Sequence, residues 1–79
     1  MENKGRIERI TVDPQVMVGK PVIKGTRIPV ALILKMLGQG MPVEEILREY
    51  PRLEEQDIYA ATMYAAQVVE HGENYYALA

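Results

Sequence analysis

The chain has 79 residues, no cysteine and a formal net charge of −2. A chain of this length forms a single domain that removes only about 60 % of its unfolded surface from water, so we expect a small core and marginal stability. The lack of cysteine excludes disulfides, thiolate metal sites and a catalytic thiol. No apolar run approaches the roughly 18 residues that cross a bilayer, and no secretory signal is evident, so we expect a soluble, cytoplasmic protein without membrane contact.

The charges are divided unevenly along the chain. Residues 1–52 hold all nine lysines and arginines against six acidic residues, which gives +3, whereas residues 53–79 hold five acidic residues and no lysine or arginine, which gives −5. A polyanion is therefore attracted to the first part and repelled by the second.

The first part of the chain predicts a flexible start over residues 1–9 and short strands with a hairpin over residues 10–29. Ile10 and Val12 alternate with polar neighbours, which is typical of a short strand, and the same alternation continues to Val18. We therefore expect an N-terminal β element ahead of any helices.

The segment "GKPVIKGTRIPV", Gly19 to Val30, predicts a tight hairpin. Val22–Ile23 and Arg27–Ile28 form two extended arms on either side of a glycine turn at Gly25, where glycine accepts a positive φ without steric cost. Its apolar residues indicate a structural corner that seats the strands on the first helix, with the cationic side chains as a secondary electrostatic feature.

Three helices are predicted over residues 30–71. The first, residues 30–39, is almost wholly apolar and is expected to be buried. The second, residues 42–50, carries apolar residues on one face and charged residues on the other. The third, residues 54–71, starts with acidic residues that suit the positive end of the helix dipole. Residues 72–79 form a tail.

The third helix is apolar around more of its circumference than a small core can cover. One face, which we expect to meet the core, carries Ile58, Ala61, Ala65, Val68 and Val69. A second strip and the aromatic tail predict a partner or dimer interface. The residues of this predicted interface are Tyr59, Ala60, Met63, Tyr64, Ala66, Tyr75 and Tyr76. The alternative is that Tyr59 and Tyr64 fold over the first helix or the hairpin of their own chain.

The cationic residues form a candidate nucleic-acid contact. Gly19-Lys20 resembles part of a phosphate loop, but the glycine expected five residues earlier and the hydroxyl residue expected afterwards are both prolines. Side chains on a rigid hairpin and on the helices can instead contact phosphates of a nucleic-acid backbone. The candidates are Lys20, Lys24, Thr26, Arg27, Lys35, Arg48 and Arg52. The alternative is that these side chains are simply solvated.

The sequence does not predict catalysis or a metal site. His71 is the only histidine, and no second ligand lies at helical spacing from it, so its expected role is at the carbonyl end of the third helix. The carboxylates have ordinary positions at helix starts or on the surface, and no pairing of a nucleophile with a base is visible. We therefore expect a protein that is not an enzyme, with no cofactor and no small-molecule substrate.

The second and third helices have the order of a helix-turn-helix pair, with residues 42–50 followed by residues 54–71. In such domains the start of the second helix of the pair enters the major groove of DNA. Here that start, residues 54–57, carries three carboxylates, which a polyanion repels. Any DNA contact is therefore expected to use the cationic residues of the first part of the chain.

Two blocks, "GKPVIKGTRIPV" and "LGQGMPVEEILREYPRLEEQDIYAATMYA", resemble the prokaryotic family known as domain of unknown function 433, from about Ile10 to Val69. The resemblance implies a homeodomain-like fold of three helices with a short β element before it, and an antitoxin-like role beside a small nuclease-like toxin. The family tends to carry Ser or Thr where this chain has Pro42 and Glu54. Because each lost cap costs about 1 kcal/mol, we expect frayed helix starts.

Together these features predict a mainly α, tri-helical helix-turn-helix bundle with a short N-terminal β hairpin. The leading functional hypothesis is a non-catalytic, antitoxin-type regulator that forms a homodimer, binds a small toxin-like protein and contacts DNA through its basic first part. The alternative is a homodimeric protein-interaction module with no nucleic-acid role. A salt titration of DNA binding separates the two, because phosphate contacts weaken steeply with salt.

Overall fold

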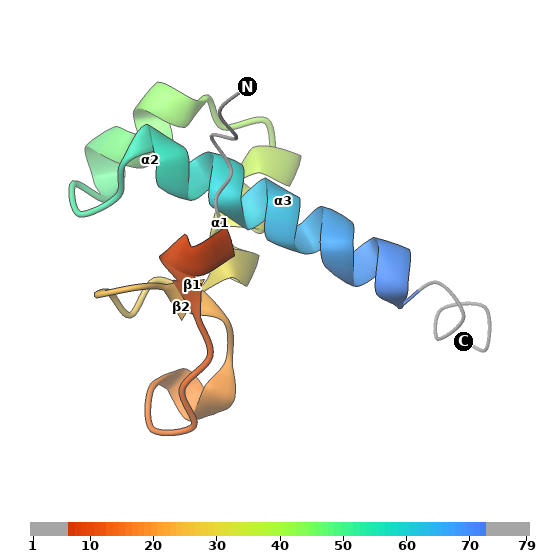
Figure 1. Ribbon diagram of the computed structural model, residues 1–79. Helices are drawn as coiled ribbons and strands as arrows, with labels where there is room; N and C mark the ends of the chain where they lie inside the picture. The colour runs from red at the N-terminus through yellow and green to blue at the C-terminus, as the bar shows by residue number, and fades with distance from the viewer. Residues whose placement is uncertain (1–6, 73–79) are drawn as a thin grey trace.

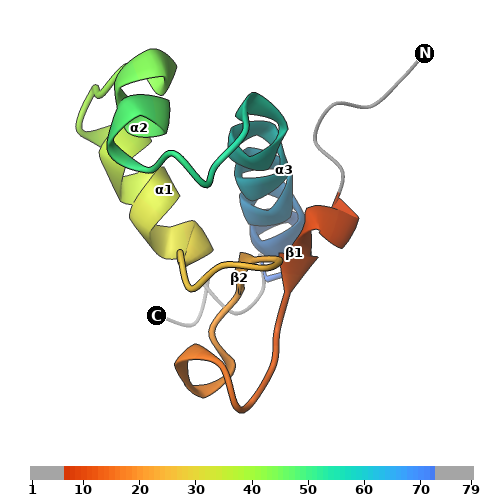
Figure 2. The ribbon, with the colours of Figure 1, turned by 90° about the vertical axis from the view of Figure 1, so that its left-hand side faces the viewer.

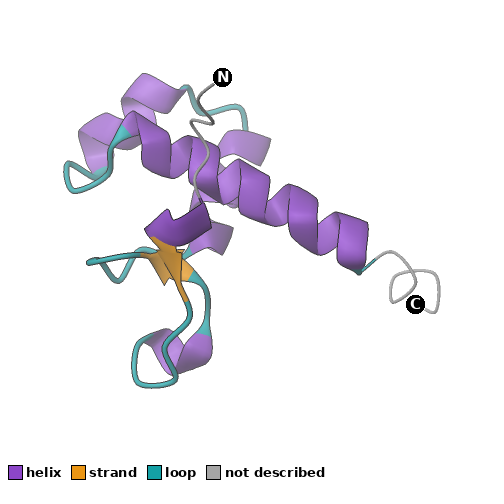
Figure 3. Cartoon of the chain, in the orientation of Figure 1, coloured by secondary structure: helices purple, strands orange, loops and turns teal. Residues whose placement is uncertain are grey.

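The computed structural model describes residues 7–72 of the 79-residue chain. Most of this range is helical, and the strands occupy only a small patch below the helices (Figure 3). The elements are the 3-10 turn η1 (Ile7–Arg9), β1 (Ile10–Thr11), the 3-10 turn η2 (Met17–Gly19), β2 (Val22–Ile23), α1 (Val30–Gly38), α2 (Val43–Glu49) and α3 (Glu55–His71). The predicted fold class, three helices after a short β hairpin, is confirmed.

Helix α1 begins and ends where the sequence predicts. Pro29 precedes its first turn with an extended backbone (φ −70°, ψ 144°), and its ring costs no hydrogen bond there because the first turn has no acceptor for that N–H. The helix stops at Gly40, whose φ of +88° favours glycine and whose N–H donates to the carbonyl of Leu37. Between these ends α1 buries Val30, Ile33 and Met36 against the other helices.

The β element is smaller than predicted and has one pairing that the sequence did not predict. β1 and β2 are antiparallel, with Ile10 opposite Ile23 and Thr11 opposite Val22. The predicted second arm lies beside β2 through an antiparallel bridge between Val22 and Pro29. The N–H of Ile23 donates to the carbonyl of Ile28 at 3.0 Å, and the N–H of Val30 donates to the carbonyl of Pro21 at 2.9 Å. The predicted hairpin around Gly25 is therefore present, and β1 adds a pairing on the other edge of β2 that the sequence did not predict. The glycine turn itself is present, with Gly25 at φ +80°.

The expected extension of the strand alternation to Val18 was wrong. Asp13 starts a turn instead, and its carboxylate accepts the N–H of Gln15 at 2.9 Å. The chain then enters η2, where Val18 has a φ of 57° and is 90 % exposed. The chain reverses here so that β2 can return beside β1, and no strand forms between them.

The core lies where the three helices and β2 meet. Figure 2 shows α1 and α2 on one side of α3, with η1 and β1 on the other. The buried cluster is apolar throughout and consists of Ile23, Val30, Ile33, Met36, Ile46, Leu53, Ile58 and Ala61. At about 25 cal/mol per Å² of apolar surface, burial of these side chains supplies the main stabilisation of a domain of this size.

Helix α3 is longer than the core it covers. It has 17 residues against nine in α1, which at about 1.5 Å per residue is about 25 Å against about 14 Å. Its second half consequently extends past the rest of the domain (Figure 1). Within residues 7–72 no helix is long and apolar enough to cross a membrane.

Candidate binding surfaces on helix α3 and the hairpin

The face of α3 that was predicted to meet the core does so only in its first half. Ile58 and Ala61 are buried, and Ala65 is half-buried. Val68 and Val69, by contrast, are 43 % and 59 % exposed, so their predicted place in the core was wrong. The reason is the length of α3, whose last turns extend past the rest of the domain (Figure 1).

The predicted interface residues of α3 differ in how exposed they are. Met63 and Ala66 are exposed, while Tyr59 and Tyr64 are half-buried. Tyr64 packs against the core cluster, as the alternative reading of the tyrosines expected. The prediction for Ala60 was wrong, because this residue is fully buried in its own chain and is not part of the exposed strip. Tyr75 and Tyr76 lie outside the described residues.

An apolar groove runs between α1 and the second half of α3. It has a volume of about 360 Å³. Its lining residues are Lys20, Pro21, Pro29, Val30, Ala31, Leu34, Tyr64, Ala65, Val68 and Val69. Among them only Lys20 carries a charge, so a ligand that fits this groove must be largely apolar. The exposed side chains of Val68 and Val69 therefore form the outer edge of a continuous apolar surface. We name this surface the α1–α3 groove.

The structure brings together three of the seven candidate nucleic-acid residues. Thr26, Arg27 and Arg52 line one hollow of about 460 Å³, together with Thr11, Asp13, Val16 and Gly25. Arg52, from the turn between α2 and α3, donates to the carbonyl of Gly25 at 2.7 Å, which fixes it beside the hairpin turn. Thr26 is already used for local structure, since its hydroxyl donates to the carbonyl of Ile23 and accepts the N–H of Ile28.

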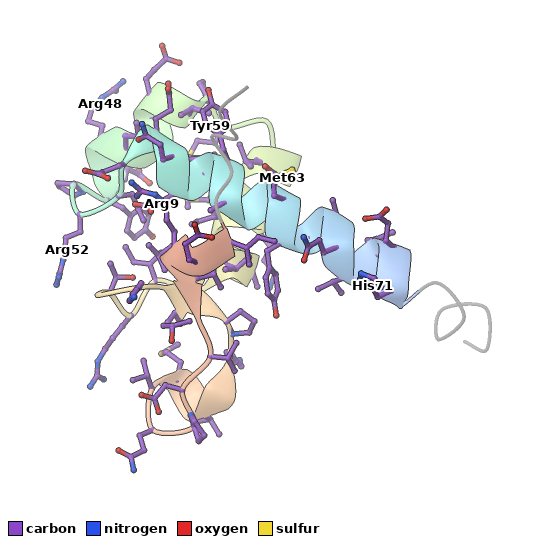
Figure 4. All side chains as sticks on the ribbon, in the orientation of Figure 1. Arg9, Arg48, Arg52, Tyr59, Met63 and His71 are labelled. Atoms are coloured by element: carbon purple, nitrogen blue, oxygen red, sulfur yellow. The ribbon has the colours of Figure 1, made fainter. Side chains whose placement is uncertain are left out.

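We name this hollow the basic hollow after Arg27 and Arg52, although Asp13 also lines it. The other candidate cations do not line it. Lys20 lines the α1–α3 groove, and Lys24 lies beside Glu8, Arg9 and Asp57. Lys35 lies on α1 and is exposed. Arg48 lies on α2, at the same end of the molecule as Arg52 and opposite the end that carries His71 (Figure 4).

A partly buried ion pair at the start of α3 has no counterpart among the predicted sites. Nη1 of Arg9 lies 2.8 Å from Oδ1 of Asp57 and 3.0 Å from Oε1 of Glu54. The Asp57 side chain is only 6 % exposed, the Glu54 side chain 65 %. The hydrogen bond to Asp57, followed by the one to Glu54, raises the pKa of Arg9, so its charge is secure. No periodicity links η1 to a helix 48 positions later, and the sequence offered no signal for this contact.

Asp57 also corrects the expectation of a frayed start. Its Oδ2 accepts the backbone N–H of Glu54 at 2.8 Å, so a carboxylate three positions into the helix satisfies a group that a Ser or Thr cap would leave free. Asp57 therefore makes two stabilising contacts at the start of α3: one with the backbone of Glu54 and one with Arg9 of η1. Helix α2 has no side-chain cap at Pro42, as the sequence predicts.

Within residues 7–72, no group of three or more His, Asp or Glu side chains is arranged to hold a metal ion. His71 is exposed in the last turn of α3.

A family model described as "Protein of unknown function (DUF433)" matches residues 10–65. The chain belongs to the DUF433 family. The match runs from β1 to the middle of α3, so it covers the core and stops close to the point where α3 leaves it. The resemblance noted in the sequence is therefore confirmed.

Two related sequences and one solved structure are similar to this chain. An uncharacterized protein, y4eO, from Sinorhizobium fredii is 36 % identical over 58 residues, which are 73 % of this chain and 26 % of that protein. The chain thus spans about a quarter of the length of that relative. An uncharacterized protein from Archaeoglobus fulgidus is 79 % identical over 24 residues, 30 % of this chain and 67 % of the other. The crystal structure of a DUF433 member from Anabaena variabilis superposes with a TM-score of 0.73 at 36 % identity, covering 87 % of this chain and 68 % of the other.

Proposed function

We propose that this DUF433 protein is a non-catalytic binding protein of the antitoxin type, which holds a small protein partner on the α1–α3 groove and the adjoining end of α3. The observation that carries the proposal is the groove itself, whose lining is apolar apart from Lys20 and whose outer wall, Val68 and Val69, is exposed. Exposed apolar surface that continues into a groove is typical of a protein–protein contact.

The lining of the groove favours a protein partner over a reacting substrate. Enzymatic sites bring several polar groups together on one point, and such groups have perturbed pKa values. The α1–α3 groove offers only the ammonium of Lys20 and the phenol of Tyr64 among its lining residues. An apolar side chain or a turn of an amphipathic helix fits these walls better than a polar metabolite does.

The basic hollow supports a secondary contact with DNA. Arg27 is exposed there, and Arg52 is held beside it by its bond to Gly25. The exposed carboxylates Glu54 and Glu55 oppose insertion of the start of α3 into the major groove. The DNA contact that we propose is therefore to backbone phosphates, through the hairpin and the α2–α3 turn.

The partner contact is tested with a charge placed in the groove. The neighbouring open reading frame is read first: a small nuclease-like protein encoded there is the probe for calorimetry, and a neighbour of another kind contradicts the antitoxin type. We expect Val68→Glu to weaken binding by about 30-fold, because a central apolar contact contributes about 2 kcal/mol. Gln67→Glu is the matched control, since Gln67 is exposed on the same helix but does not line the groove. Equal binding by both variants would contradict the proposal.

The homodimeric module is the second candidate, and the same surface favours it, because an uncovered helix end can be covered by a second copy. Light scattering of the wild type and Val68→Glu distinguishes it. A wild-type dimer that becomes monomeric in Val68→Glu supports the dimer on this groove. A wild-type monomer leaves the groove to a different protein.

A further inference from the structure

We propose that the partner of the α1–α3 groove presents an acidic amphipathic helix, which lays its apolar stripe between α1 and α3 and places a carboxylate beside that stripe against Lys20. The inference rests on the proposed function, because it describes the partner of the same surface. It adds the conformation of the bound segment and the sign of its charge, neither of which follows from an apolar groove alone.

The walls of the groove favour a helix, because they offer few backbone groups to an incoming chain. Two of the lining residues, Pro21 and Pro29, have no N–H to donate. The carbonyl of Pro21 already accepts the N–H of Val30 at 2.9 Å, and the carbonyl of Pro29 accepts that of Leu32 at 3.1 Å. The other lining residues, apart from Lys20, lie on α1 and α3, whose backbone groups mostly bond within each helix. An extended segment finds few partners there, whereas a helix satisfies its own backbone.

The groove admits two apolar side chains from successive turns of such a helix. Its volume of about 360 Å³ is near the lower end of the ~300–1,000 Å³ that ligand pockets span, so it holds a few side chains. On α3 its lining runs from Tyr64 to Val69, which is about 7.5 Å along the axis at ~1.5 Å per residue. Residues i and i+4 of a partner helix are about 6 Å apart along its axis and therefore fit within this span.

The charged side chains on the lining and on the α1 wall of the groove are cationic. Lys20 is exposed and lines the groove, so its stem covers apolar surface while its ammonium stays at the mouth. Helix α1 contains no acidic residue, and Lys35 is exposed on it one turn after the lining residue Ala31. A carboxylate on the partner is therefore attracted to this mouth, although the chain as a whole has a net charge of −2.

The one carboxylate in the second half of α3, Glu70, lies on the other side of the helix. At about 100° per residue, its direction is about 170° from the mean direction of the lining residues on α3. Those lining residues are Tyr64, Ala65, Val68 and Val69. Among residues 7–72, Lys20 forms no ion pair. Within that part of the chain, the ammonium at the mouth of the groove is thus available to a carboxylate from outside.

These charges favour a different protein over a second copy. In a two-fold contact, the groove face of one copy meets the same face of the other. Each Lys20 then approaches described residues that include cations and no carboxylate, and like charges brought together lower the affinity. An acidic helix replaces that repulsion by an attraction, so charge distinguishes two occupants that the apolar walls alone do not.

The inference is tested with two synthetic helical peptides, each titrated into the full chain and followed by calorimetry. Both peptides carry leucines at positions i, i+4 and i+7, and they differ only in the residues that flank this stripe, glutamates in one and lysines in the other. We expect the wild type to bind the acidic peptide about tenfold more tightly than the basic one, because an exposed ion pair and the opposing repulsion each contribute a few-fold. The preference should shrink at high salt, which screens exposed charges.

The role of Lys20 is isolated by two variants that make the same change of charge. Lys20→Glu should abolish the preference for the acidic peptide. Lys24→Glu is the matched control, since Lys24 is exposed four positions later and does not line the groove, and it should keep the preference. Equal loss of the preference in both variants would show that net charge alone acts, and would overturn the contact with Lys20.

The remaining outcomes separate this inference from the proposed function. Equal affinity of the wild type for the two peptides, with both weakened by Val68→Glu, overturns the acidic partner and leaves the groove as a binding surface. Binding of neither peptide also overturns the acidic helix, while calorimetry with the protein encoded beside this chain judges the proposed function by itself. A wild-type dimer that becomes monomeric in Val68→Glu places a second copy in the groove and overturns the inference as well.

Discussion

The two halves of α3 have the same local conformation and opposite surroundings. In the first half, Asp57, Ile58, Ala60 and Ala61 are buried, and Asp57 is paired with Arg9. The second half contains no buried residue, and Val69 is 59 % exposed. The first half therefore supplies the fully buried contacts of α3, while the last turns of the second half present an apolar surface that is open to solvent.

This division agrees with the extent of the family match, which ends at residue 65. The matched part holds every residue of the buried core cluster. The last turns of α3 add a wall of the α1–α3 groove. One continuous helix thus links the part that folds to the part that we propose binds.

The largest expected contrast comes from truncating one apolar residue in each half. Ile58 is 2 % exposed and lies in the core cluster, so Ile58→Ala should lower the free energy of unfolding by about 2–5 kcal/mol, because it loses burial and leaves a cavity. In a domain of this size such a loss removes much of the stability. Urea denaturation followed by circular dichroism measures it.

Val69→Ala is the matched truncation in the second half. Because Val69 is largely exposed, we expect a change of at most about 1 kcal/mol in the same denaturation experiment. Similar losses for Ile58→Ala and Val69→Ala would show that both halves stabilise the domain equally, and the contrast between them would be wrong.

The next contrast concerns two carboxylates that share Nη1 of Arg9. Asp57→Asn should cost about 1–3 kcal/mol, because Asp57 is buried and also accepts the N–H of Glu54. Glu54→Gln should cost less than about 0.5 kcal/mol, because the Glu54 side chain is 65 % exposed and water screens its ion pair. The measurement is thermal unfolding at low salt, and equal costs would contradict a special role for the buried carboxylate.

The charge of Arg9 does not change with pH in the range where the two variants are compared. The hydrogen bond to Asp57 raises the pKa of Arg9 in the folded protein. A raised pKa gives stability that is fully present below the pKa of the unfolded chain and is lost only as the pH rises through the folded value. For an arginine both values lie far above neutrality, so Arg9 stays charged throughout the range in which the variants are compared.

The sequence predicted the helices well, because their signals are local. Helical spacing of apolar residues, Pro29 before α1 and Gly40 after it mark boundaries that the structure reproduces. The β element was predicted less well, because local sequence does not show which segment pairs with the free edge of β2. Alternation continued to Val18 in the sequence, yet a turn at Asp13 interrupts it.

The candidate sites were predicted in part for the same reason. Sequence spacing identified the broad apolar surface of α3 but placed Ala60 on it and Val68 in the core, since it could not show how far α3 extends past α1. The grouping of Arg27 with Arg52 needs the hairpin turn to approach the α2–α3 turn, which spacing along the chain does not encode. The Arg9 to Asp57 contact is missed for the same reason.

The smallest expected effect separates helix formation from domain stability. Gln67 is exposed in the second half of α3, and in an ordinary helix Gly is about 1 kcal/mol less favourable there than Ala. Because no residue after Ala61 in α3 is buried, Gln67→Gly can melt the last turns while the core remains folded. We expect Gln67→Gly and Gln67→Ala to differ by less than about 0.5 kcal/mol in global unfolding. Faster amide hydrogen exchange should appear only from about residue 65 onward. A full difference of about 1 kcal/mol in global unfolding would mean that the projecting turns unfold together with the core, and that the two halves of α3 form one cooperative unit.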